Sequence, residues 1–146
     1  MIMDRAAIQK LIPQKDAMCL LDSVEFWDDQ RIICTSAQHG SVVNPLRTRA
    51  GLSTLHGIEF AAQAMAAHGG LTAAGREPPH VGLLLSVRDC VFHCRRLDDI
   101  AAPLTIEAEQ MGNNDNTRLY RFKVSAQDVL LVEGRVAVLL RGGTQA

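Results

Sequence analysis

The chain has 146 residues, a formal net charge of -1 and 21% charged residues. A chain of this length forms one domain that buries about two-thirds of the surface of its unfolded state. The balanced charge, without a basic stripe, argues against a general nucleic-acid-binding protein. The first residues carry Asp4 and lack the apolar core and cleavage site of a secretion signal, and no apolar run is long enough to cross a membrane. We therefore expect a cytoplasmic protein.

The four cysteines include no CxxC pair and are too few for the disulfide framework of a small secreted domain. Cys90 and Cys94 flank His93 in the segment CVFHC, and this combination of residues can bind zinc. On a strand, however, the two thiols point to one face and the imidazole to the other, so the three cannot converge. We expect buried free thiols and no metal site.

The N-terminal part predicts a short helix followed by a hairpin. Asp4 can cap a helix that ends at about Ile12, just before a proline. Residues 18–27 and 31–39 have the composition of two antiparallel strands, and the segment DDQ at 28–30 predicts the turn between them.

A loop and one long helix come next. The loop at 40–53 contains a proline and a glycine that discourage regular structure. Ser53 or Thr54 can cap the helix, which we expect to continue to about His68, where two glycines would end it. A second loop follows at 72–79.

The rest of the chain predicts strands separated by turn segments at 113–116 and 126–128. The four predicted strands are 81–96, 103–111, 117–125 and 129–140. About six antiparallel strands must then cover a single helix, and a sheet that curls around a helix buries most of it. The alanines of that helix give the clearance that close wrapping needs. We therefore predict an α+β hotdog fold, in one domain that spans residues 1–146.

Three segments resemble the beta-hydroxyacyl-acyl carrier protein dehydratases of the hotdog superfamily. They are LIPQKDAMCLLDSV at Leu11–Val24, GIEFAAQAMAAHGG at Gly57–Gly70 and VGLLLSVRDCVFHCRRLDDIAAPLTIEAE at Val81–Glu109, and the likeness extends to about Leu140. In that family the helix carries an acid in an E.AAQ type of motif, which Glu59 and Gln63 match here. The helix motif is also similar to GIEYMAQAIAAH, which is typical of a divergent branch, the 3-hydroxyacyl-carrier protein dehydratases of aryl polyene type gene clusters.

One family residue is absent. The main family has its catalytic histidine in an HFPG motif ahead of the helix, and at that spacing from Glu59 this sequence has Pro45, preceded by Asn44. The family's two-residue mechanism therefore cannot be carried over whole. The divergent branch tends to have a small polar residue before this proline, so Asn44 becomes a candidate substrate-binding residue.

The resemblance implies dehydration of a 3-hydroxyacyl thioester, which needs a base for the C2 proton and an acid for the 3-hydroxyl group. Such proton transfers contribute about 10²–10⁴-fold to the rate. We expect Glu59 to be the central acid/base; alternatively it is a solvated glutamate near a helix start. His56, on the same helix face, could supply the missing base or only support the helix start. Gln63 could orient the carboxylate or bind substrate, and as a merely buried amide it would still need a partner.

Further candidates concern substrate binding. Gly57 would let a ligand approach the backbone, and its N–H could hold the thioester carbonyl. Alternatively, this glycine is needed only for helix packing. Arg47 and Arg49, together with Arg95 and Arg96, are either solvated charges or a docking surface for an acidic acyl carrier protein or its phosphopantetheine phosphate.

Three other histidines are of lower rank. His39 and His80 lie at predicted strand ends and could enter the site of a neighbouring subunit. His68 lies where a helix C-terminus favours a cation, so we expect a structural role for it.

The sequence thus predicts a dehydratase of fatty acid or polyene type biosynthesis that needs no cofactor and acts on acyl groups carried by an acyl carrier protein. We expect a homodimer or larger assembly, because the long apolar strand at 81–92 needs its edge covered. Two alternatives remain open. One is a non-catalytic or half-catalytic subunit that pairs with another hotdog subunit, and the other is an acyl thioesterase.

Overall fold

The computed structural model describes residues 1–73, 80–114 and 116–141, with side chains outside 80–85 and 140–141. In chain order its strands and α-helices are β1 (Met3–Asp4), α1 (Arg5–Ile8), β2 (Ser23–Trp27), β3 (Arg31–Ser36), α2 (Gly57–Leu71), β4 (His80–Phe92), β5 (Leu104–Asn114), β6 (Thr117–Ala126) and β7 (Val129–Arg141). Short 3-10 helices lie at Asp16–Met18, Gln38–Gly40 and Thr54–His56. Within these described ranges no helix is long and apolar enough to span a membrane.

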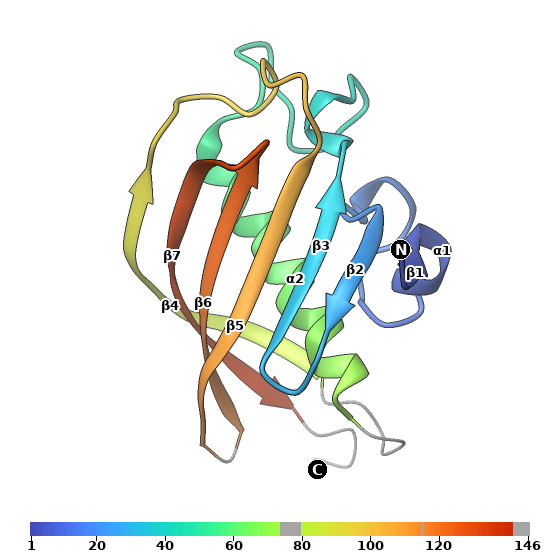
Figure 1. Ribbon diagram of the computed structural model, residues 1–146, viewed down its shortest axis with the longest axis vertical. Coiled ribbons are helices and arrows are strands. Elements are labelled where there is room, and N and C mark those ends of the chain that lie inside the picture. The colour runs from blue at the N-terminus through green and yellow to red at the C-terminus, as the bar shows by residue number, and fades with distance from the viewer. Residues whose placement is uncertain (74–79, 115, 142–146) are drawn as a thin grey trace.

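All strands in the described ranges belong to one seven-stranded sheet, in the order β1-β2-β3-β5-β6-β7-β4. Every pairing is antiparallel. Figure 1 shows α2 behind the sheet, with the long strands crossing in front of it and β4 curving away at one side. The sheet therefore has one face against the helix and one face toward solvent.

The core lies between α2 and the sheet. Strands β5 and β6 alternate buried and more exposed side chains, so one row of each strand points at the helix. From Phe60 to Gly69 the helix buries every residue except Ala62. Close approach is visible at Gly57, where an added Cβ would lie 2.6 Å from Cγ1 of Val132. Small residues therefore let the sheet wrap the helix.

Most predicted elements are present, with shifted ends. The Oδ1 of Asp4 accepts the Ala7 N–H at 2.9 Å, which confirms the predicted cap. The helix it caps stops at Ile8 instead of Ile12, and the first strand of the hairpin begins only at Ser23. The sequence analysis missed β1, since a two-residue strand has no periodicity of its own.

The predicted end of the long helix was wrong. Helix α2 runs past both glycines to Leu71, and the Thr72 backbone and side chain then bond the His68 carbonyl. Gly70 instead permits packing, because a Cβ there would lie 3.1 Å from Cδ2 of Leu11. Most of the loop predicted at 72–79 lies outside the described residues.

His68 is structural, but not as a cation. Its ring is fully buried and contacts the Asp28 carbonyl and the Tyr120 hydroxyl, each at 2.8 Å. Because a carbonyl can only accept, Nε2 carries the proton and Nδ1 accepts from the tyrosine. Burial lowers the pKa of His68. The ring is therefore held neutral, against the charge that the sequence analysis expected.

All four cysteines are free, but Cys90 and Cys94 are only partly buried, against the buried thiols that the sequence predicted. Burial raises the pKa of the Cys34 thiol to about 12. In the CVFHC segment β4 ends at Phe92, so His93 lies beyond the strand, where its Nε2 is 3.2 Å from Oε2 of Glu133.

Candidate active site

Glu59 lies in the first turn of α2, between the half-buried Ile58 and the fully buried Phe60. Its side chain is exposed, and within the described part of the chain it has no hydrogen-bond or ion-pair partner. The helix is fixed by its buried residues, so this carboxylate is held at a defined point at the edge of the core. It is available to another molecule.

His56 ends the 3-10 helix Thr54–His56 and directly precedes α2. Its φ of -71° and ψ of -8° are helical, so the backbone turns continuously from His56 to Glu59. Residues three apart on such a turn share a face. The two side chains form no ion pair with each other in the structure as described, and His56 is half-buried.

Gln63 is buried and makes contacts that the helix spacing did not reveal. Its Oε1 accepts the Leu20 N–H at 2.7 Å, and its Nε2 donates to the Met18 carbonyl at 2.8 Å. The amide therefore fastens the segment before β2 to α2. These contacts match the alternative of a buried amide with its own partners, and they do not include Glu59.

Gly57 does not offer the free donor that the sequence analysis expected. The 3-10 helix ahead of α2 supplies carbonyl oxygens, and the Gly57 N–H donates to that of Thr54. Together with its close packing on Val132, this contact favours the alternative in which the glycine serves helix packing.

Asn44 is buried in the loop between β3 and α2. Its Nδ2 donates to the Gln38 carbonyl at 2.8 Å, and its Oδ1 accepts the Leu46 N–H at 2.9 Å. Both ends of the amide therefore hold the loop in shape.

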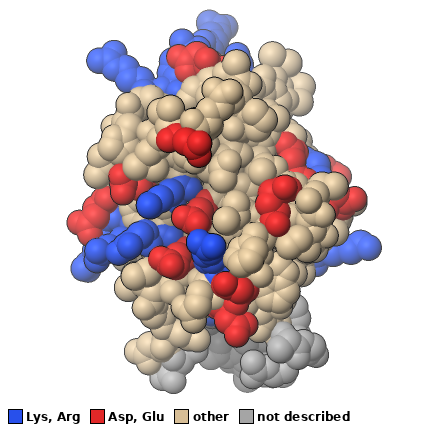
Figure 2. Space-filling model, in the orientation of Figure 1, with Lys and Arg blue, Asp and Glu red and all other residues tan. Residues whose placement is uncertain are grey.

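The arginines fall into two pairs. Arg96 and Arg47 lie 2.5 Å and 3.8 Å from Oδ2 of Asp98. Arg49 and Arg95 are exposed, and the described residues give neither an ion-pair partner. Figure 1 places the loops at 41–53 and 93–103 at one end of the molecule, where Figure 2 shows a group of Lys and Arg side chains.

Among the lower-rank histidines, His39 is buried inside its own subunit. Its Nε2 lies 2.9 Å from the Ile100 carbonyl, and its Nδ1 has no partner in the described structure. His80 opens β4, but its side chain is not among those described.

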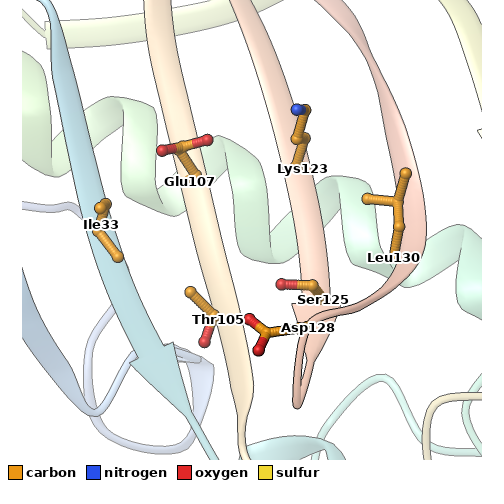
Figure 3. Close-up of a pocket in the computed structure, with 7 residues that line it drawn as sticks. All are labelled: Ile33, Thr105, Glu107, Lys123, Ser125, Asp128 and Leu130. Atoms are coloured by element: carbon orange, nitrogen blue, oxygen red, sulfur yellow. The ribbon is translucent and has the colours of Figure 1, made fainter.

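A polar hollow lies elsewhere, on the outer face of the sheet (Figure 3). It is lined by Ile33, Thr105, Glu107, Lys123, Ser125, Asp128 and Leu130. These side chains point away from α2, and Glu59 is not among them. Acidic and basic side chains are mixed over this face in Figure 2. The hollow is therefore separate from the candidate active site.

Apolar side chains are exposed beside the start of α2. Val91 and Phe92, near the end of β4, are 47% and 43% exposed, and Leu55 in the 3-10 helix is 57% exposed. Phe92 pairs with Val132, which itself contacts Gly57, so this end of β4 adjoins the start of α2. Among the residues that the structure describes, β4 pairs with β7 alone and its other edge is open.

Comparison with known proteins decides the family. The sequence matches the ApeP-like family model, described as ApeP dehydratase, over residues 6–143. The chain belongs to this family. This ApeP-like protein is thus a dehydratase, and the dehydratase family predicted from the helix motif is confirmed.

Solved structures confirm the predicted fold of the ApeP-like chain. The dehydratase heterocomplex ApeI:P from Xenorhabdus doucetiae matches with a TM-score of 0.81 at 21% identity, over 94% of this chain and 92% of that one. A mutant of the thioesterase SAV0944 from Staphylococcus aureus matches with a TM-score of 0.61 at 15% identity, over 82% and 93%. The PaaI protein of E. coli matches with a TM-score of 0.58 at 13% identity, over 80% and 81%. No curated protein sequence matches this one.

Proposed function

We propose that this ApeP-like dehydratase removes water from 3-hydroxyacyl thioesters attached to the phosphopantetheine arm of an acyl carrier protein. In this reaction the C2 proton is removed, a C2–C3 double bond forms, and the 3-hydroxyl group leaves with a proton as water. The product is a trans-2-enoyl thioester. One observation carries the assignment, namely the exposed carboxylate of Glu59, which has no partner among the described residues, on a helix whose other residues are buried or half-buried.

Glu59 and His56 are the proposed proton-transfer groups. The thioester carbonyl makes the C2 proton acidic, so a base beside C2 and an acid beside the 3-hydroxyl group are sufficient for elimination. The continuous helical turn puts both side chains on one face, where they can act on neighbouring carbons of one substrate. Gln63 supports this helix through the segment before β2.

A second hotdog subunit is the proposed partner across β4. An open strand edge with exposed apolar side chains favours pairing with another sheet. The edge adjoins the start of α2, so a partner there would also cover the substrate beside Glu59. The partner is either a second copy or a different hotdog subunit, and the similarity to the ApeI:P heterocomplex supports the latter.

The acyl carrier protein is proposed to dock at the loops that carry the arginines. Arg49 and Arg95 are exposed and have no acidic partner among the described residues, so they can attract an acidic surface or a phosphate. Arg47, held beside Asp98, adds to the positive charge of the same end.

The substitution Glu59→Gln tests the assignment. Glutamine is nearly isosteric and cannot exchange the proton, so we expect turnover of a 3-hydroxyacyl carrier protein to fall by about 10²-fold or more. The thermal midpoint should change little, because the carboxylate bonds none of the described residues. Mass spectrometry of the carrier protein measures the loss of water from the intact thioester. A thioesterase would instead release the free acid.

Glu109→Gln is the matched control, because Glu109 lies on the outer face of β5, paired across the sheet with Arg121. It should retain full activity. A Glu59→Gln variant that also retains most of its activity would show that the helix carboxylate is not the catalyst.

His56→Ala separates a self-sufficient enzyme from a half-catalytic subunit. If His56 is the second group, the purified protein is active alone, and we expect the substitution to lower the rate per folded molecule by about 10²-fold. An inactive pure protein that becomes active when mixed with another hotdog subunit would favour the half-catalytic alternative. Glu59→Gln in that mixture would then show whether this chain supplies the acid.

A further inference from the structure

Asp98 lies in the loop after β4 with only 3% of its side chain exposed. Its Oδ1 accepts the Leu52 N–H at 2.9 Å and the Arg96 Nε–H at 3.0 Å. Its Oδ2 accepts from the second nitrogen of Arg96 at 2.5 Å and lies 3.8 Å from Arg47. One carboxylate thus joins two separate loops.

The backbone beside this carboxylate is fitted closely to it. Gly51 has a φ of +96°, which favours glycine, and an added Cβ would lie 2.5 Å and 2.6 Å from the two carboxylate oxygens of Asp98. The loop ahead of α2 therefore rests directly on the Asp98 side chain.

A short antiparallel ladder continues from this point toward α2. The Leu97 N–H donates to the Leu52 carbonyl at 2.8 Å, and the Thr54 N–H donates to the Arg95 carbonyl at 3.0 Å. The Thr54 hydroxyl also donates to the Cys94 carbonyl at 2.7 Å. Thr54 begins the 3-10 helix that carries His56, and α2 follows immediately. The ladder thus fixes where the catalytic helix starts.

We propose that Asp98 is a positioning residue for the dehydration, which holds the segment 51–54 so that His56 and Glu59 face the substrate correctly. The inference rests on the proposed function. Asp98 touches neither of these two residues and acts through the ladder. The same carboxylate forms an ion pair with Arg47 in the loop ahead of α2. Arg49 lies at the tip of the Thr48–Gly51 turn in that loop.

The contacts require an ionised carboxylate. Two nitrogens of Arg96 donate to the carboxylate, one to each oxygen, and the Leu52 N–H donates to one of the same oxygens. An asparagine retains one acceptor oxygen and presents an NH₂ group to the guanidinium, which repels it. The Arg96 and Leu52 donors hold the pKa of Asp98 well below its usual value, so the carboxylate is charged throughout the neutral range.

Asp98→Ala and Asp98→Asn, assayed on a 3-hydroxyacyl carrier protein, test the proposal. Displacing a catalytic group by about 1 Å can cost roughly 10²-fold in rate. We therefore expect kcat per folded molecule to fall by at least about tenfold for Asp98→Ala, and less for Asp98→Asn, which keeps the Leu52 contact. The KM should change less than kcat. Asp99→Asn, at the exposed neighbouring position, is the control and should behave as the wild type.

Gly51→Ala should displace the segment 51–54 by an independent route, because the added Cβ would push against the Asp98 carboxylate without altering any charge. It should lower kcat in the same direction. If both Asp98 variants and Gly51→Ala lose activity only in proportion to their loss of folded protein, the positioning role is overturned. Active Asp98 variants beside an inactive Glu59→Gln would overturn this inference alone, whereas an active Glu59→Gln would overturn the proposed function.

Discussion

His68 joins α2 to the sheet through a ring with no exposure to solvent. It accepts a hydrogen bond from Tyr120, whose hydroxyl lies 3.4 Å from a nitrogen of Arg118. Burial and the nearby Arg118 lower the pKa of His68, although the Asp28 carbonyl opposes this shift. In the unfolded chain the pKa of a histidine is about 6.5. The unfolded state therefore binds more protons than the folded state as the pH falls below that value.

From this difference we predict that His68 destabilises the fold in acid. Stability should be complete above about pH 6.5 and should decline as the pH falls from there toward the lowered pKa of the folded state. Urea midpoints measured between pH 8 and pH 5 will test this. His68→Asn should be less stable than the wild type at pH 8, by about 1–3 kcal/mol, because the shorter amide does not reach the Asp28 carbonyl that Nε2 bonds. The urea midpoint of this variant should also fall less between pH 6.5 and pH 5 than that of the wild type. An equally steep fall would exclude His68 as the cause. His93→Gln, at an exposed position, is the control.

The residues of the candidate site differ in how far sequence alone could place them. His56 and Glu59 lie three apart on one helix, so local spacing predicts their shared face. Gln63 forms hydrogen bonds to residues that are 43 and 45 positions away. Asn44 instead bonds the backbone of its own loop region. Asp98 acts on Leu52 across 46 positions. Partners at such separations are set by tertiary structure, which hydrophobic periodicity does not encode.

At the level of elements, the strand-like segments between the predicted turns matched β5, β6 and β7 well. The turn at 126–128 was also recognisable, and Gln127 and Asp128 there have φ values of 49° and 64°. The end of α2 was not predictable in this way. Glycine is a frequent helix terminator, but here Gly70 lies against Leu11, and only the fold brings that partner.

Gly57 allows a direct test of the close contact between α2 and the sheet. An alanine there would place its Cβ 2.6 Å from Cγ1 of Val132, a β-branched residue with little freedom to move. We predict that Gly57→Ala lowers the free energy of unfolding by about 1–3 kcal/mol, the usual cost of overpacking. Gly112→Ala is the matched control, because its nearest neighbour would be 4.0 Å away. Urea denaturation of both variants should separate them, and equal midpoints would contradict the packing argument.

At the scale of the whole molecule, the α+β class and the single helix under one sheet followed from the order of predicted elements. The position of β4 did not, since β4 precedes β5 in sequence yet lies at the far edge of the sheet beside β7. Strand order of this kind depends on pairings between distant segments.

The open edge of β4 leads to a prediction about assembly. With Val91 and Phe92 exposed beside it, the isolated chain should not persist as a monomer at micromolar concentration. Sedimentation velocity should detect a dimer or larger species, alone or with a second hotdog subunit. Val91→Lys should weaken this association, because a charge would have to be buried in the contact. Val129→Lys, at an exposed valine that begins β7, should not. A wild-type chain that sediments only as a monomer, even in the presence of a second subunit, would contradict the pairing model.

The sheet order also has a consequence for the timing of folding during synthesis. Strand β4 leaves the ribosome before β5, β6 and β7, yet among the described strands it pairs with β7 alone. It therefore lacks this partner strand until β7 has been translated. Pairings between distant segments form slowly, and unpaired apolar strands favour aggregation. The edge proposed for subunit pairing can thus take its final form only when translation has passed β7, so that assembly follows the synthesis of that strand.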